Sequence, residues 1–160
     1  MAYQSTENRI IPQGIYDTST VQNAPLGTLI TAQDALLGEG EFVYLKGVAS
    51  TAAGDLVIYD QRAGTTTRTV AGSRGPCAVA MSANVANQYG WYQVSGAAAV
   101  KSAAAVAAAS VYVTATAGTV DDAVVATDKV DGARYKTADG TPAAGLAILQ
   151  LARPSLNGNG

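Results

Sequence analysis

The sequence lacks several residues on which common enzymes and metal proteins depend. It contains no histidine, which removes the most frequent general base and a frequent metal ligand. Its single cysteine, Cys77, can form neither an internal disulfide nor a cysteine-rich metal site. Catalytic Ser-His-Asp and Cys-His arrangements are therefore excluded, and no glycine-rich phosphate loop occurs. We expect a protein that is not an enzyme and that carries no cofactor and no metal.

Charge and long apolar runs are also scarce. Charged residues make up 14% of the chain and the net charge is −2, which argues against a surface for nucleic acid. The longest candidate for an apolar run, residues 97–109, is mostly alanine and is interrupted by Lys101 and Ser102. No membrane span is therefore expected. No apolar segment follows a basic N-terminus, so the sequence predicts no signal peptide. We expect synthesis in a reducing compartment, the cytoplasm of the producing cell.

Small and β-branched residues dominate what remains. Alanine accounts for about a fifth of the 160 residues, and Leu, Ile, Val and Phe together for about another fifth, so the apolar core is expected to be modest. Sixteen valines and sixteen threonines favour β-strands. The length indicates one domain, or one domain with an arm.

The chain divides into three regions. Residues 1–25 form a polar segment that contains Pro12 and Gly14 and shows no helical or strand period, so we expect an extended N-terminal arm. Such an arm is either a frayed terminus or a segment ordered by docking on a partner. Residues 26–153 are expected to form the β-rich domain, and residues 154–160 a flexible tail.

Short strands separated by turns are predicted throughout the domain. The sequence favours a mainly β fold with little helix, either a small antiparallel β-sandwich or a barrel-like domain. The alanine-rich segment is interpreted as strand over residues 97–101 and as loop over residues 103–109, despite the high helix propensity of alanine. Residues 121–125 are expected to form a short helical turn. The strands are expected at residues 27–31, 41–47, 55–60, 65–70, 77–81, 89–94, 110–116, 132–137 and 145–151.

A faint internal repeat supports a sheet of similar units. The segments that begin at Val57 and Val111 share Val, Ala, Gly and Thr at equal spacing, and each places an Ala-Gly turn after a strand. The letters are common, so chance is a rival explanation. The repeat predicts two similar hairpins and not a solenoid.

Charged residues offer only weak candidates for chemistry. Carboxylates beside turns can act as a glycosidase pair, but they are more often solvated; here they are Glu39, Glu41, Asp55 and Asp60. Four aspartates, Asp121, Asp122, Asp128 and Asp131, can bind calcium or form a solvated acidic loop, and the sequence leaves that choice open. Three arginines, Arg62, Arg68 and Arg74, can meet an acidic partner or guard an edge strand.

The aromatic group at residues 89–92 is the densest of the sequence. Trp91 and Tyr92 follow each other, so they point to opposite faces of a strand. We expect one to enter the core and the other to point outward, and Gly90 to break the strand. A stacking platform for sugars or bases is possible, but core packing with a subunit contact is favoured.

Five short stretches resemble the capsid decoration, or cement, proteins of tailed bacteriophages. They are residues 53–57 (Ala-Gly-Asp-Leu-Val), 75–80 (Gly-Pro-Cys-Ala-Val-Ala), 89–96 (Tyr-Gly-Trp-Tyr-Gln-Val-Ser-Gly), 109–113 (Ala-Ser-Val-Tyr-Val) and 145–149 (Gly-Leu-Ala-Ile-Leu). The resemblance covers residues 26–153 and carries no catalytic motif. The long arm and residues 119–140 depart from the compact family pattern.

The resemblance implies a structural virion protein on the outer capsid surface. Its partners would be the major capsid protein and further copies of itself, as a homotrimer or a dimer, with no nucleic acid and no membrane. We expect the arm to supply much of the capsid contact through Arg9, Ile10, Ile11 and Tyr16, and Trp91 and Tyr92 to supply a subunit contact. The alternative function is a carbohydrate- or receptor-binding β-domain of a tail fibre or spike, which requires an exposed Trp91.

Overall fold

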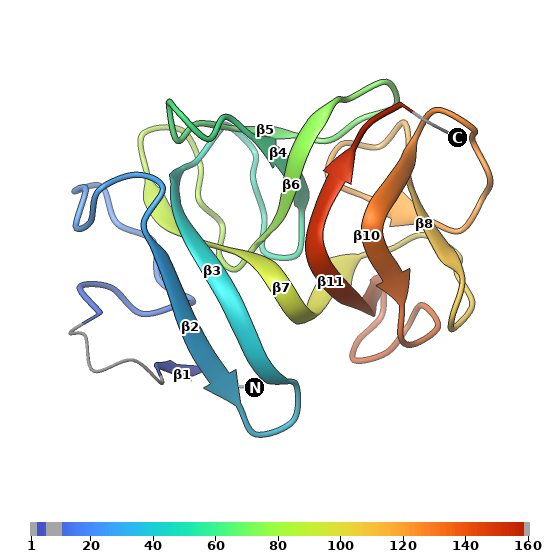
Figure 1. Cartoon of the computed structure of the whole chain (residues 1–160), viewed down its shortest axis with the longest axis horizontal. Coiled ribbons are helices and arrows are strands. Elements are labelled where there is room, and N and C mark those ends of the chain that lie inside the picture. The colour runs from blue at the N-terminus through green and yellow to red at the C-terminus, as the bar shows by residue number, and fades with distance from the viewer. Residues whose placement is uncertain (1–2, 6–10, 159–160) are drawn as a thin grey trace.

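A computed structural model describes residues 3–5 and 11–158 of the chain. This part contains eleven β-strands and no helix (Figure 1), and so no helix in it is long and apolar enough to cross a membrane. The strands are β1 (Gln4–Ser5), β2 (Leu29–Asp34), β3 (Gly38–Lys46), β4 (Leu56–Tyr59), β5 (Thr66–Arg68), β6 (Gly75–Ala80), β7 (Tyr89–Lys101), β8 (Ser110–Val113), β9 (Val120–Asp121), β10 (Lys129–Tyr135) and β11 (Leu146–Leu156).

All eleven strands belong to one connected antiparallel sheet. Its order is β1-β2-β3-β7-β6-β11-β10-β8-β9, with β4 and β5 attached through β6. The sheet is not closed into a barrel. The prediction of a mainly β, antiparallel domain with little helix is confirmed, and the alanine-rich segment behaves as expected, since β7 continues to Lys101 and a loop follows.

Two units with the same pairing pattern share the long strand β7. In the first unit, β3 pairs with β7, β4 pairs with β5 and β6, and β6 pairs with β7. In the second unit, β7 pairs with β11, β8 pairs with β9 and β10, and β10 pairs with β11. β7 crosses the middle of the molecule and thereby joins the two units (Figure 1). The predicted pair of similar hairpins is confirmed as β4–β5 and β8–β9.

A close backbone approach lets β7 pass from one unit to the other. The pairing of β3 with β7 shifts register between Glu41 and Phe42, and Gly96 lies beside this shift with a φ of 95°. A Cβ atom at Gly96 would collide with the carbonyl oxygen of Glu39. Only glycine combines this backbone conformation with this approach.

The two units bury different kinds of side chain. The first unit packs aromatic residues on one face of β2, β3 and β7, namely Tyr3, Phe42, Tyr44 and Trp91 together with Ile15, Ile30 and Ala32. Its other face carries Val43, Leu45, Val57, Ala78, Ala80, Tyr92 and Val94. The second unit packs mostly Val, Ala and Leu around β7, β8, β10 and β11, and this cluster extends into the first unit through Leu56, Cys77 and Val79.

The N-terminal segment lies against its own domain wherever the structure describes it. β1 pairs with β2, Tyr3 and Ile15 are buried, and Ser19 forms an antiparallel bridge with Tyr89. The aromatic face of β2, β3 and β7 therefore uses residues 11–25 as its cover. For its described residues, the surface that orders this arm is intramolecular.

Three local predictions are wrong. Residues 121–125 do not form a helical turn. β9 begins at the fully buried Val120 and ends at Asp121, and a bend and an irregular loop follow. The flexible tail does not begin at residue 154, because β11 runs to Leu156 and buries Pro154; the proline is tolerated at a register shift between β10 and β11. Gly90 does not break a strand, since it pairs with Leu45 inside β7.

Candidate functional site

Gln13 anchors the arm to the aromatic face of the first unit. Its side-chain Nε2 donates to the carbonyl oxygen of Tyr89 at 2.8 Å, and its Oε1 accepts from the hydroxyl of Tyr44 at 2.7 Å. Its backbone carbonyl accepts from the indole Nε1 of Trp91 at 2.9 Å. Gln13 thus satisfies the polar groups of two buried aromatic side chains, which would otherwise be costly to bury.

The four predicted capsid contacts fall in different environments. Arg9 and Ile10 lie outside the described residues. Ile11 is half-buried and packs against the aromatic cluster of the first unit. Tyr16 is 43% exposed and lies with its ring centre 6.4 Å from that of Tyr3. Burial raises the pKa of Tyr16 to about 12, helped by Tyr3 and Asp34, so the phenol is neutral at physiological pH.

Trp91 and Tyr92 are both fully buried, so the expectation that one of them points outward is wrong. They do face opposite sides of β7, as predicted, because Trp91 packs in the aromatic cluster and Tyr92 in the cluster beside β4 and β6. Both faces of β7 are covered in the first unit, by the arm on one side and by the β4–β6 strands on the other. Neither side chain offers surface for the predicted subunit contact.

A small apolar cleft opens beside Tyr16. It has a volume of about 160 Å³ and is lined mainly by apolar groups of the arm, the β2–β3 turn, β7 and β11, including Tyr3, Tyr16, Leu37, Ala99 and Leu146. The neighbouring Leu36 is 82% exposed. Its N–H and that of Leu37 donate to Oδ1 of Asp34 at 2.8 and 2.9 Å, so a local turn holds Leu36 in place.

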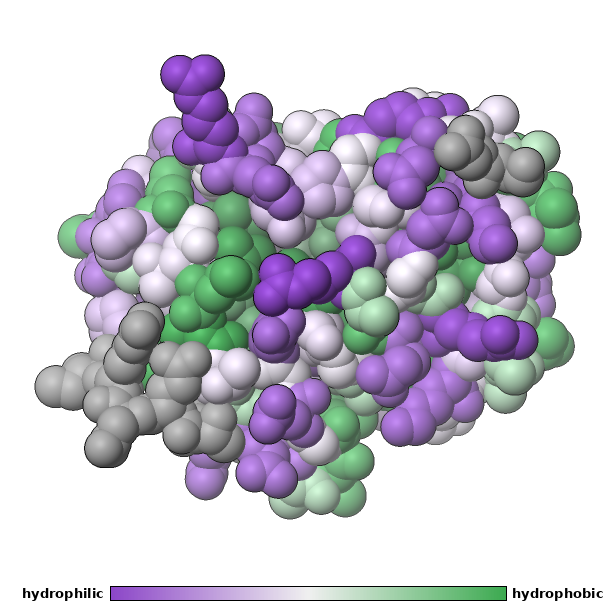
Figure 2. Space-filling view, viewed as in Figure 1, coloured by the Kyte–Doolittle hydropathy of each residue, from purple (hydrophilic) through white to green (hydrophobic). Residues whose placement is uncertain are grey.

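A second apolar area lies on the opposite face of β2 and β3. Figure 2 shows apolar side chains gathered over these two strands. A hollow of about 260 Å³ here is lined by Leu29, Val43, Tyr59 and Arg153 among others. Leu29 is 46% exposed, and Arg153 Nη2 lies 2.9 Å from Oε2 of Glu41 in a solvent-exposed ion pair.

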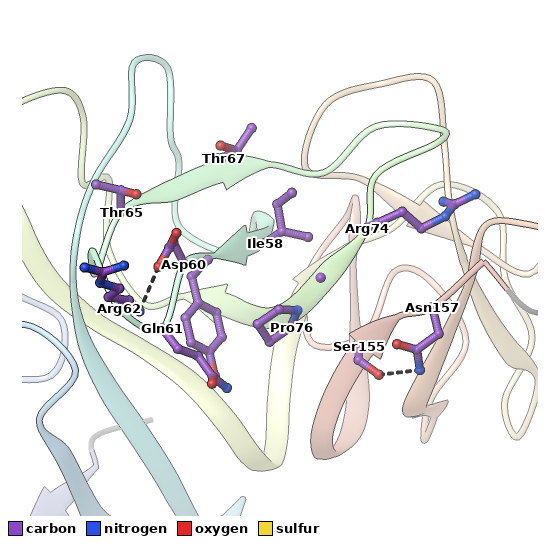
Figure 3. A pocket seen from close by; sticks show the side chains of 12 residues that line it. Ile58, Asp60, Gln61, Arg62, Thr65, Thr67, Arg74, Pro76, Ser155 and Asn157 are labelled. Carbon is purple, nitrogen blue, oxygen red and sulfur yellow. Dashed lines mark hydrogen bonds between the residues drawn. The ribbon is translucent and has the colours of Figure 1, made fainter.

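A wide, open groove is lined by the β4–β5 hairpin, the start of β6 and the end of β11 (Figure 3). Its volume is about 700 Å³. Its polar side chains are engaged locally: Asp60 Oδ1 accepts from the backbone N–H of Arg62 at 2.7 Å, and Asn157 Nδ2 donates to Oγ of Ser155 at 2.9 Å. These contacts stabilise a turn and the end of β11, and they do not bring the polar side chains together at one site.

A buried carboxylate joins the two units. Asp55 is fully buried, and its oxygens lie 2.7 Å from Nε of Arg68 and 2.8 Å from Nζ of Lys101. Asp55 also accepts from the backbone N–H of Ala52 at 2.9 Å. Because Arg68 belongs to β5 and Lys101 ends β7, this ion cluster ties the first hairpin to the shared strand.

The candidate catalytic carboxylates are engaged in separate structural contacts. Asp55 neutralises Arg68, Glu41 pairs with Arg153, and Asp60 caps a turn. The N–H groups of Ala63 and Arg62 lower the pKa of Asp60. Among the three hollows described above, only the wide groove is lined by one of these carboxylates, Asp60.

The aspartates of residues 121–131 are likewise separated. Asp128 accepts from the N–H of Gly72 at 2.9 Å and Asp131 from Asn157 at 3.3 Å. Burial raises the pKa of Asp121. Within residues 3–5 and 11–158, no group of three or more acidic or cysteine side chains is placed to hold a metal ion.

The sequence was also compared with known proteins. No protein-family model and no curated protein matches it.

Proposed function

We propose that this protein is a structural virion component that binds the outer surface of a tailed-bacteriophage capsid and stabilises the head. The single observation that carries the proposal is an exposed apolar surface around Tyr16. Tyr16 and Leu36 are exposed beside a cleft lined by Leu37, Met81 and Leu146. Exposed apolar groups that surround a preformed cleft mark sites of protein contact. The resemblance of residues 26–153 to decoration proteins supports the choice of partner.

The surface is preorganised for such a contact. The arm that carries Tyr16 is held by Gln13 and by the bridge between Ser19 and Tyr89, and Leu36 is held by Asp34. Binding therefore costs little ordering entropy at these residues. Many identical sites on a shell would strengthen a modest contact further if the protein is a homotrimer or dimer, as the resemblance implies.

The test is binding of purified protein to capsids that lack it. Deleting residues 2–20 would remove Tyr3, Gln13 and Ile15 and so uncover the aromatic core, which confounds binding with folding. Tyr16→Ala is sharper, because the side chain is partly exposed. We expect about tenfold weaker binding or more for this variant. The matched control is Val21→Ala, also in the arm and 64% exposed, which should bind like the unmodified protein.

The control decides how the result is interpreted. If Tyr16→Ala and Val21→Ala bind capsids equally well, Tyr16 is no contact. If the unmodified protein does not bind capsids, the proposed function fails as a whole.

The alternative of a carbohydrate- or receptor-binding domain loses its central residue. It required an exposed Trp91, and Trp91 is fully buried with its indole N–H bonded to Gln13. Tyr16 is the only aromatic side chain among the described residues that is classed as exposed. One exposed ring does not make the flat platform on which a sugar stacks.

A further inference from the structure

The cleft beside Tyr16 has the size of one large apolar side chain. Its volume of about 160 Å³ is close to the roughly 150 Å³ that accommodates a benzene-sized group in a protein. Tyr3, Leu37, Met81 and Leu146 contribute to its walls. The phenols of Tyr3 and Tyr16 both have a raised pKa, mainly through burial, so the cleft contains no charged phenolate at neutral pH.

One wall of the cleft is a stretch of β7 in which the backbone groups of Ala99 have no strand partner among the described residues. On this side of β7, Ala97 O accepts from the hydroxyl of Tyr3 at 2.7 Å, and Lys101 N–H donates to Gly54 O at 2.8 Å. Residues two apart in a strand direct their N–H and C=O to the same side. Ala99 lies between these two residues, so its N–H and C=O also point toward the cleft and away from β11.

The opposite strand agrees with this assignment. Ile148 is the β11 partner of Ala99, and its carbonyl accepts instead from Lys136 N–H on the β10 side at 2.8 Å. No strand flanks Ala99 on the cleft side within residues 3–5 and 11–158. A partner backbone can therefore supply the missing acceptor and donor.

A buried side-chain oxygen beside the cleft also has no partner. Gln93 is fully buried and lines the cleft. Its Nε2 donates to Tyr3 Oη and Ala97 O at 3.1 and 3.0 Å, whereas its Oε1 has no hydrogen-bond partner among the described residues. Buried polar atoms are normally satisfied, so a donor that reached this covered oxygen from the cleft would satisfy it.

We infer that the cleft binds an extended peptide segment of the major capsid protein, which inserts one large apolar side chain and pairs its backbone with Ala99. This inference rests on the proposed function for the identity of the partner. The hydrogen-bonding pattern favours a peptide over a purely apolar ligand, because a peptide offers an N–H and a C=O next to an apolar side chain. The exposed Tyr16 and Leu36 would flank the segment as it leaves the cleft.

The first test fills the cleft. Ala99→Leu adds bulk at the wall of the cleft, and Ala152→Leu makes the same change at an exposed position of β11 outside it. Both variants are first checked for an unchanged circular dichroism spectrum. We expect about tenfold weaker binding to depleted capsids for Ala99→Leu, and unchanged binding for Ala152→Leu. Equal binding of the two variants would overturn the inference.

The second test needs no capsid and keeps the two proposals separable. N-acetyl-L-phenylalanine N-methylamide carries one aromatic side chain and both backbone groups. In an NMR titration it should shift the Ala99 amide and the Gln93 side-chain amide with a dissociation constant on the order of millimolar. Ala99→Leu should abolish these shifts. Absence of saturable shifts at the cleft would overturn the inference.

The combined outcomes distinguish the two claims. If the unmodified protein ignores capsids but the dipeptide analogue binds the cleft, the proposed function fails while a peptide site is supported. If sedimentation instead shows a dimer that Ala99→Leu dissociates, a second copy of this chain occupies the cleft, and the inferred partner is wrong.

Discussion

The two units of the sheet have the same pairing pattern but close their cores in different ways. The first unit buries Phe42, Tyr44 and Trp91. The polar atoms of Tyr44 and Trp91 take their hydrogen-bond partners from the arm. The cluster of the second unit, which also includes Leu56, Cys77 and Val79 of the first, consists mostly of Val, Ala and Leu and packs without the arm. The comparison teaches that the arm belongs to the first unit's core, and that its exposed residue Tyr16 is therefore held on a fixed surface.

The largest expected effect comes from breaking the aromatic core of the first unit. Trp91→Ala removes a fully buried ring and the hydrogen bond to Gln13, so we expect a loss of about 3–5 kcal/mol in the free energy of unfolding. Urea denaturation measures this loss. The arm should also become cleavable by chymotrypsin at Tyr16 within the native state, whereas Leu149→Ala in the second unit should destabilise without releasing it. Equal protection of the arm in both variants would contradict the comparison.

The ion cluster that joins the units should give the next largest effect. Asp55→Ala leaves Arg68 and Lys101 beside a buried site with no counter-charge, which should cost about 3 kcal/mol. Glu41→Gln breaks only the exposed pair with Arg153 and serves as the control, with a cost below about 1 kcal/mol. Both values come from urea denaturation. Similar costs for the two variants would show that Asp55 does not link the units.

Alkaline pH should weaken both units through their buried tyrosines. Burial raises the pKa of Tyr92 and Tyr135 to about 12, above the value near 10 of an unfolded chain. Between these pH values the folded state holds more protons, so the stability that these tyrosines contribute is constant below about pH 10 and is lost toward pH 12. Thermal melts across this range measure the fall. Tyr135→Phe should make it shallower, and an equally steep fall would contradict the assignment for the second unit.

The smallest effect is expected at the polar end of Tyr135. Its hydroxyl lies 2.9 Å from Oγ of Ser102, which ties β10 to the end of β7. Ser102→Ala should cost about 1 kcal/mol in the free energy of unfolding. Denaturation of Ser102→Ala in the background of Tyr135→Phe is the check, because the second change should then cost almost nothing. Additive losses would show that the two hydroxyls do not interact.

Much of the fold was predictable from local sequence. The strands predicted at residues 41–47, 55–60 and 110–116 overlap β3, β4 and β8. The β-rich residues 111–113 also correctly favoured strand over helix for residues 97–101. The equal spacing of Val57 and Val111 pointed to the two hairpins. These features depend on residues close together in the chain.

The features that were missed depend on residues far apart in the chain. Alternation placed Trp91 and Tyr92 on opposite faces, but only the packed structure shows that both faces are covered. The role of Gln13 depends on Tyr44 and Trp91, and no local pattern marks it. The cleft requires the arm, the β2–β3 turn and β11 to meet. One signal was present in the sequence. Leu36 lies two residues after Asp34, and a leucine in a turn is unusual.

Cosedimentation with capsids that lack this protein tests the central claim most directly. The account predicts saturable binding in a fixed ratio to the major capsid protein, and a higher temperature at which the loaded heads release their DNA. A folded protein that stays in the supernatant at every concentration, and leaves that temperature unchanged, would contradict it.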